Sequence, residues 1–330
     1  MESAESGEFV KRIIKFRKDV FSELSKCIVG QTDVLEKFII ALLSKGHCIL
    51  HGLPGLAKTL IVSSLARALK VDFQRIQFTP DLMPSDIIGS EIIEETETGS
   101  KAFKFIKGPI FSNIILADEI NRTPPKTQAA LLQAMQEYKV TVFGKTYELE
   151  YPFFVLATEN PIELEGTYPL PEAQLDRFFF SIDIVYPSHE EEIRIASRSS
   201  FFDKDIIQPV IDKNELKAMQ GFVADVPISE KLVEYIVNMV KATRPDSSPL
   251  KITKDFVRYG AGPRASQYLV TASKAHAALQ GEYGVSTENI KSVAINILKH
   301  RIILGYGAYS SNITAENIIE DAIKYAEKML

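Results

Sequence analysis

The chain has 330 residues, 45% of them hydrophobic, and its 38 basic and 43 acidic side chains give a formal net charge of −5. This length allows about two domains with buried cores, and the acidic balance gives no overall basic field for nucleic acid. Cys27 and Cys48 lack the paired spacing of a zinc site, so we expect free thiols in a reducing cytoplasm. The charged N-terminal segment and the short apolar runs predict neither a signal peptide nor a transmembrane segment.

Secondary structure can be predicted along the chain from hydrophobic periodicity. Residues 8–26 and 31–45 have helical patterns, and short apolar strands then alternate with helices as far as Val185. The expected strands are 48–51, 73–78, 113–117, 153–157 and 178–184. This alternation predicts an α/β fold with an αβα doubly wound parallel sheet. After Tyr186-Pro187 only helical patterns follow, with Gly221 and Gly281 placed to end helices. We therefore expect a core over 1–186 and a C-terminal all-helical lid domain over 187–330.

The segment Gly52-Leu53-Pro54-Gly55-Leu56-Ala57-Lys58-Thr59 has the layout of a phosphate-binding loop between a strand and a helix. Its glycines let backbone N–H groups surround phosphates, and the helix N-terminus adds a positive dipole end. Lys58 is expected to contact the β- and γ-phosphates of ATP, and Thr59 to ligate Mg²⁺. Ala57 stands where the usual pattern has glycine, which leaves an ordinary Gly-rich turn as the alternative.

Two further strand ends carry polar side chains suited to hydrolysis. The apolar run Ile114–Ala117 is followed by Asp118, expected to hold Mg²⁺, and by Glu119, expected to deprotonate the attacking water. The strand candidate at 153–157 is followed by Asn160, whose amide can both donate and accept a hydrogen bond to position that water. Asn160 also precedes Pro161, a pair typical of turns, and both interpretations can hold together.

Two insertions interrupt the alternation of strands and helices. Residues 88–107 place glutamates before and lysines after Thr98-Gly99-Ser100, which predicts a β-hairpin with cross-strand ion pairs. Residues 139–149 alternate apolar side chains around Phe143-Gly144-Lys145 and predict a second hairpin. Either hairpin can contact a substrate or simply decorate the surface.

Taken together, these motifs resemble the MoxR family of AAA+ ATPases in linear order from Ile28 to Ile302. The matching runs are Gly52–Thr59, Arg75–Asp86, Ala117–Arg122, Leu156–Pro161, Glu165–Ala173 and Gly262–Ala265. The resemblance makes Ala57 acceptable, since family members carry either small residue there. It implies that Asn160 is the sensor-1 residue, Arg177 the arginine finger and Arg264 the sensor-2 arginine. It also implies ATP contacts from Ile28, Val29 and Gly30 beside the adenine, and from Gly52, Pro54, Gly55, Leu56, Ala57, Lys58, Thr59 and Leu60.

The same resemblance implies an ATP-hydrolysing homo-oligomer, expected to be a hexameric ring, that remodels or matures protein partners. Von Willebrand factor A domain proteins are candidate partners, and the two hairpins would face the pore or the substrate. Because Arg177 lies at the entry to the outer strand, we expect it to point away from its own subunit's phosphates. A nucleic-acid machine, helicase-like or loader-like, is the alternative that the acidic charge disfavours, so no nucleic acid is expected. A non-hydrolysing switch is disfavoured by the presence of Glu119, Asn160 and Arg177. The sequence assigns no role to Arg122 or Arg301.

Overall fold

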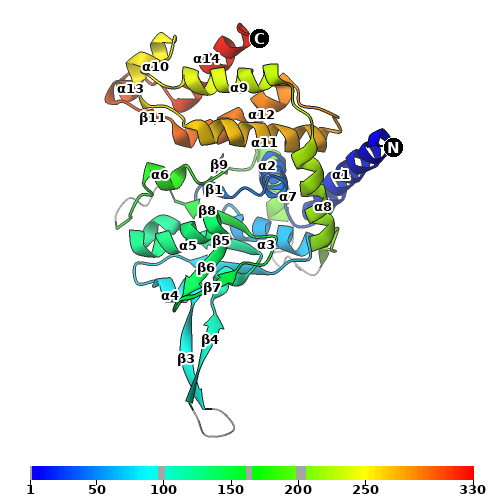
Figure 1. Cartoon of the computed structure of the whole chain (residues 1–330), viewed down its shortest axis with the longest axis vertical. Helices are drawn as coiled ribbons and strands as arrows, with labels where there is room; N and C mark the ends of the chain where they lie inside the picture. The colour runs from blue at the N-terminus through cyan, green and yellow to red at the C-terminus, as the bar shows by residue number, and fades with distance from the viewer. Residues whose placement is uncertain (1, 96–100, 161–165, 198–205) are drawn as a thin grey trace.

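A computed structural model describes residues 2–95, 101–160, 166–197 and 206–330. The expected hairpin turn at 98–100 and the residues Pro161 and Glu165 lie outside the described residues. Figure 1 shows a sheet with flanking helices in the middle of the molecule, a group of helices above it, and a long hairpin that projects below.

The central sheet has five parallel strands. Their order across the sheet is β2 (Phe73–Gln77), β5 (Ile114–Asp118), β8 (Phe154–Glu159), β1 (Cys48–His51) and β9 (Phe180–Asp183). All five predicted strands are confirmed to within two residues. Gln77 pairs with Asp118 and His51 with Glu159, so the polar ends of these four strands meet at one edge of the sheet.

Helices cover both faces of the sheet, because its central strands bury side chains on both sides. In β5, Leu116 belongs to one apolar cluster and Ile115 to the other. The first cluster includes side chains of α1 (Glu2–Ser25), α2 (Thr32–Leu43) and α3 (Lys58–Ala68). The second includes side chains of α4 (Pro84–Ile88) and α5 (Pro125–Glu137). The predicted αβα arrangement is therefore confirmed.

Both predicted hairpins are present. The first consists of β3 (Gly89–Glu95) and β4 (Lys101–Lys107), and an ion pair of 2.9 Å between Lys104 and Glu94 joins its strands. The second consists of β6 (Lys139–Val142) and β7 (Lys145–Glu148). Short helical turns complete the core: η1 (Pro109–Phe111), η2 (Ile120–Arg122) and α6 (Glu172–Leu175).

The C-terminal region is helical, as expected. Its elements are α7 (His189–Ser197), α8 (Lys213–Asp225), α9 (Glu230–Ala242), α10 (Lys251–Phe256), α11 (Pro263–Gln280), α12 (Thr287–Leu298), η4 (Lys299–Arg301), α13 (Tyr306–Ser310) and α14 (Ala315–Glu327). A short antiparallel pair that the sequence did not predict, β10 (Val257–Tyr259) with β11 (Ile303–Leu304), lies among them. Gly281 ends α11 with a left-handed backbone, as predicted. The prediction for Gly221 was wrong: it lies inside α8, where burial of Val223 favours continuing the helix.

The helical region packs directly on the core. The first apolar cluster continues from the sheet to Leu269 of α11 and Ile297 of α12, and α11 contacts both α1 and α2. A division of the chain after residue 186 therefore stays a proposal. Cys27 and Cys48 are buried free thiols, as expected. In the part of the chain that the structure describes, no helix has both the length and the apolar character needed to cross a bilayer.

Candidate nucleotide-binding site

The loop between β1 and α3 has the backbone of a phosphate cradle. Gly55 and Ala57 both have positive φ angles, 86° and 56°, and α3 begins directly after Ala57, at Lys58. Ala57 thus adopts a left-handed backbone that is uncommon for a residue other than glycine. The Lys58 Nζ donates a hydrogen bond of 2.6 Å to the Gly52 carbonyl, and burial lowers the pKa of Lys58.

A cavity of about 330 Å³ lies beside this loop and is called the phosphate cavity below. Its lining residues come from the loop and the start of α3, from strands β2 and β5, and from the residues that follow β5 and β8. They are Pro54, Gly55, Ala57, Lys58, Thr59, Arg75, Asp118, Glu119 and Asn160. The fold therefore brings the predicted loop, acid pair and amide together. Arg75 is the one member of this set to which the sequence gave no role.

The two acids are held by neighbouring strands. Thr158 of β8 donates a hydrogen bond of 2.6 Å from Oγ1 to Asp118 Oδ1 and accepts one of 2.8 Å from the Glu119 backbone N–H. Arg75 of β2 donates from Nε to Asp118 Oδ2 at 2.9 Å. Glu119 has a φ of 58°, a left-handed conformation that turns the chain out of the strand. The Glu119 backbone is thus held in a position from which its side chain can face the phosphate cavity.

The Glu119 carboxylate also has two side-chain partners. Gln77 donates from Nε2 at 2.9 Å, and Arg122 donates from Nη1 at 3.0 Å, both to Glu119 Oε2. Sequence reasoning missed both contacts. Arg75 and Gln77 are two positions apart in β2, so their side chains lie on the same face of the sheet. Two polar residues at this spacing in a parallel strand were the sequence signal available for these contacts.

A buried carboxyl group lies beside the predicted sensor residue. Asn160 is 6% exposed and follows Glu159, whose side chain is 20% exposed and approaches His51 Nδ1 at 3.4 Å. Burial raises the pKa of Glu159 to about 7, and burial, aided by Lys299, lowers the pKa of His51 to about 4. Burial is thus the largest influence on the pKa of both groups, and it favours their neutral forms between about pH 4 and pH 7.

The predicted adenine contacts divide between two cavities. Ile28, Val29, Leu56 and Leu60 line an apolar cavity that shares Gly55 and Ala57 with the phosphate cavity. An apolar pocket beside a phosphate cradle suits a nucleotide base. Gly30 lines an adjoining cavity that Ile28 and Val29 also line, next to Glu191 and Arg194.

Arg177 and Arg264 lie elsewhere. Both line a second cavity, called the arginine cavity below, together with Lys45, Tyr138 and Tyr268. Among the described residues, the arginine cavity and the phosphate cavity have no lining residue in common. Arg177 donates to the Leu132 carbonyl at 3.3 Å, and Arg264 forms an ion pair of 2.6 Å with Asp176. This placement agrees with an Arg177 side chain directed away from its own phosphates, and it puts Arg264 on the same side.

The residues expected to hold Mg²⁺ suit that ion. Within the described ranges, no three His, Cys, Asp or Glu side chains cluster as a ready-made metal site. Thr59 and Asp118 nevertheless line one cavity, with the Asp118 Oδ1 held by Thr158. One carboxylate and one hydroxyl are typical protein ligands for Mg²⁺ where substrate phosphates supply further oxygens.

Comparison with known proteins agrees with this geometry. Residues 47–180 match the family model described as ATPase family associated with various cellular activities (AAA), and residues 250–322 match the AAA lid domain. Chaperone MoxR1 of Mycobacterium tuberculosis is 42% identical over 92% of this chain and 79% of its own length. Protein YeaC of Bacillus subtilis is 43% identical over 90% of each chain. A crystal structure of a protein assigned as an ATPase from Cytophaga hutchinsonii is 43% identical, with a TM-score of 0.90 over 98% of each chain. The chain therefore belongs to the MoxR family of AAA+ ATPases.

Proposed function

We propose that this protein binds ATP with Mg²⁺, hydrolyses the ATP, and uses the energy in an oligomeric ring to remodel protein partners. The observation that carries the proposal is that Lys58, Thr59, Asp118, Glu119 and Asn160 line one cavity. These side chains supply a phosphate-binding charge, metal ligands, a base and a water-orienting amide. Phosphoryl transfer needs little more than such positioning and charge stabilisation.

Each of these groups has a separate task. Lys58 would exchange its bond to the Gly52 carbonyl for the phosphate oxygens of ATP. Thr59 and Asp118 would hold Mg²⁺, and the bound ion would supply positive charge that stabilises the charge on the phosphates. The Glu119 carboxylate would take the proton of the attacking water, and the Asn160 amide would orient that water.

Arg177 and Arg264 would complete the site of a neighbouring subunit. Both lie in the arginine cavity, away from the phosphate cavity of their own chain. Arg177 directly precedes Phe178, close to β9 at the edge of the sheet. A guanidinium that reaches the next subunit's γ-phosphate neutralises charge that develops during transfer. We propose a hexameric ring as the assembly that closes these sites.

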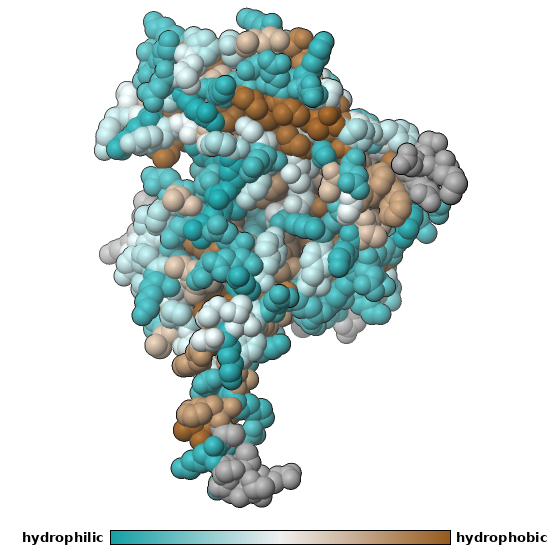
Figure 2. Space-filling model, viewed as in Figure 1, coloured by the Kyte–Doolittle hydropathy of each residue, from teal (hydrophilic) through white to brown (hydrophobic). Residues whose placement is uncertain are grey.

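A chaperone-like action on proteins is supported by the name of the relative MoxR1 and by the exposed hairpin. Ile93 and Phe103, on the arms of β3 and β4, are 62% and 74% exposed, and Figure 2 shows apolar colour on this projection. Exposed apolar side chains on a projecting element suit contact with protein. Proteins with von Willebrand factor A domains are the candidates that family membership supports. The two free thiols suit a cytoplasmic location.

The test of the shared site is complementation between two inactive variants. Lys58→Ala loses its own nucleotide site but keeps Arg177, whereas Arg177→Ala keeps its nucleotide site and loses the arginine. Arg177→Ala alone should retain ATP affinity and lose about 10³-fold in turnover, the lower end for an arginine finger. Activity that reappears on mixing, with mixed assembly confirmed by native mass spectrometry, supports the shared site. Mixed rings without activity contradict it.

The class of partner is tested separately. ATP turnover should be stimulated by a protein partner captured with the Glu119→Gln variant, which holds ATP without hydrolysing it. Single-stranded and duplex DNA should leave turnover unchanged. Stimulation by DNA and not by the captured protein would reject the assignment as a protein remodeller.

A further inference from the structure

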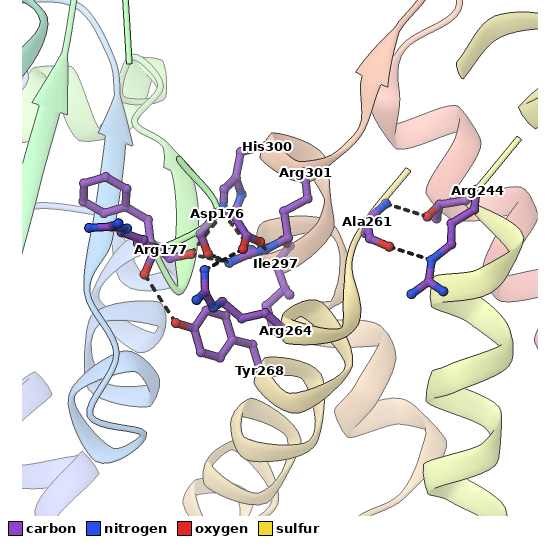
Figure 3. Close-up of polar contacts among 11 residues, drawn as sticks. Asp176, Arg177, Arg244, Ala261, Arg264, Tyr268, Ile297, His300 and Arg301 are labelled. Atoms are coloured by element: carbon purple, nitrogen blue, oxygen red, sulfur yellow. Dashed lines mark hydrogen bonds and ion pairs between the residues drawn. The ribbon is translucent and has the colours of Figure 1, made fainter. Parts of the chain in front are cut away.

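The chain segment that carries Arg177 is held by side chains of the lid. Arg301, in η4, donates from Nη2 to the Asp176 carbonyl at 2.8 Å and to the Phe178 carbonyl at 2.6 Å. Tyr268, in α11, donates from its hydroxyl to the Arg177 carbonyl at 3.4 Å. Three consecutive carbonyl groups, centred on Arg177, therefore accept hydrogen bonds from the lid (Figure 3).

Arg301 uses its whole guanidinium group for this contact. Besides the two carbonyl groups, its Nε donates to Asp176 Oδ1 at 2.9 Å and its Nη1 donates to the Ile297 carbonyl. Four of the five N–H donors of the guanidinium are thus matched by oxygen acceptors. The group also lies over the Tyr268 ring, 5.1 Å from its centroid. These bonds fix its position on both sides of Arg177.

Asp176 extends the contact to the second arginine of the cavity. Its Oδ1 accepts from Arg301 and its Oδ2 accepts from Arg264 Nη1 at 2.6 Å. The Arg264 side chain is 38% exposed, whereas that of Arg301 is 1% exposed. Arg264 can thus reach a ligand in the cavity, and Arg301 cannot. Any effect of Arg301 on chemistry must pass through the residues that it holds.

We infer that Arg301 is a positioning residue that directs Arg177 and Arg264 toward the nucleotide of the neighbouring subunit. The inference rests on the proposed shared site. Because Arg301 lies in the lid and holds the backbone of the core, the lid and the arginine finger have to move together. A further lid contact lies on β9, directly after this segment, where Asn296 of α12 donates to the Ser181 carbonyl at 3.0 Å.

Arg301→Lys is the variant of choice, because it keeps the positive charge and removes the planar fork that spans two carbonyl groups. If Arg301 only stabilises the fold, Arg301→Lys should reduce turnover equally in the chain that donates Arg177 and in the chain that supplies the nucleotide site. A positioning residue would make it defective only in the subunit that donates Arg177. Complementation separates the two roles, since the Lys58→Ala partner only donates the arginines and the Arg177→Ala partner only supplies the nucleotide site.

The donor test places Arg301→Lys in the Lys58→Ala chain and mixes it with Arg177→Ala. Recovered turnover should be lower by on the order of 10²-fold than in the mixture of Lys58→Ala with Arg177→Ala, because small misplacements of a catalytic group cost this much. The acceptor test places Arg301→Lys in the Arg177→Ala chain and mixes it with Lys58→Ala. Recovery there should match that of the unmodified pair, which also shows that the substituted lid folds and assembles.

Two further variants complete the design. Arg244 is a lid arginine that donates to the Ala261 carbonyl at 2.9 Å, within the lid and apart from residues 176–178 (Figure 3). Arg244→Lys in the donor should leave recovery unchanged. Tyr268→Phe keeps the ring and removes only the hydroxyl that holds the Arg177 carbonyl. In the chain that donates Arg177, Tyr268→Phe should reduce the recovered turnover by a smaller factor, roughly tenfold.

The outcomes are distinct. Loss on the donor side alone, with the Arg244→Lys control intact, supports Arg301 as a positioning residue. Equal loss on both sides, or full recovery on both, overturns this role and leaves the shared site standing. Absence of recovery in the unmodified pair of Lys58→Ala and Arg177→Ala overturns the shared site and, with it, the role of Arg301.

Discussion

Replacing Glu159 with glutamine should make the folded protein more stable, and increasingly so as the pH rises. The pKa of Glu159 is raised by burial from an ordinary value of 4.5 to about 7. Between these two values the unfolded chain releases the proton while the folded chain retains it. The stability that this group contributes is therefore complete below pH 4.5 and is lost as the pH rises through 7.

The size of the effect follows from the two pKa values. A carboxyl group whose pKa rises from 4.5 to about 7 on folding loses up to about 3 kcal/mol of stabilisation over that range. Between pH 5 and pH 8 the change is about 2 kcal/mol, because the unfolded group is already partly ionised at pH 5. His51 has the opposite slope, since its lowered pKa makes the protein more stable as the pH rises from about 4 to 6.5. His51 is present in both proteins, so the comparison reports Glu159 together with its contact to His51.

Guanidinium denaturation of the nucleotide-free protein and of Glu159→Gln, measured at pH 5, 6, 7 and 8, provides the assay. The variant should gain about 2 kcal/mol relative to the parent between the lowest and the highest pH. Glu234→Gln, at an exposed position of α9, is the matched control and should show no such trend. A difference between Glu159→Gln and parent that stays constant with pH would refute the reasoning.

Three other variants test the nucleotide site and the β3–β4 hairpin. Lys58→Ala should abolish binding of ATP with Mg²⁺, because it removes the charge facing the phosphates; stabilisation of parental size in a thermal-shift titration would contradict this. Glu119→Gln should bind ATP normally and turn it over 10²–10⁴-fold more slowly, and a loss in steady-state turnover of less than about tenfold would exclude Glu119 as the base. Serine at both Ile93 and Phe103 should leave basal turnover unchanged and abolish capture of protein partners in pull-downs, whereas undiminished capture would remove the hairpin from the partner-binding surface.

Most of the fold was predictable because its signals are local. Apolar runs marked the five strands, and charges around a turn marked the β3–β4 hairpin. The loop at 52–59 was recognisable although Ala57 replaces a glycine. Its φ of 56° shows that the position keeps the left-handed backbone for which glycine is usual. Local signals failed where tertiary packing decides the outcome, as at Gly221, which a helix end would suit but α8 passes through.

Two of the contacts that support the site, those of Gln77 and Arg301, were not predictable because they join residues far apart in the chain. Gln77 meets Glu119 only because β2 lies next to β5 in the sheet. Arg301 meets Asp176 across 125 positions, after the lid has packed on the core. In sequence, an arginine at the end of a helical run resembles any surface charge. Its 1% exposure, known only from the fold, distinguishes it.

The separation of the phosphate cavity from the arginine cavity has a consequence for stoichiometry. If each catalytic centre draws on two chains, a single subunit has no complete centre, and an open row of subunits has one fewer complete centre than it has members. Only closure into a ring gives every subunit a complete centre. Specific activity should then rise steeply with protein concentration, and dilution should inactivate the enzyme before any subunit unfolds. Assembly itself would control the consumption of ATP.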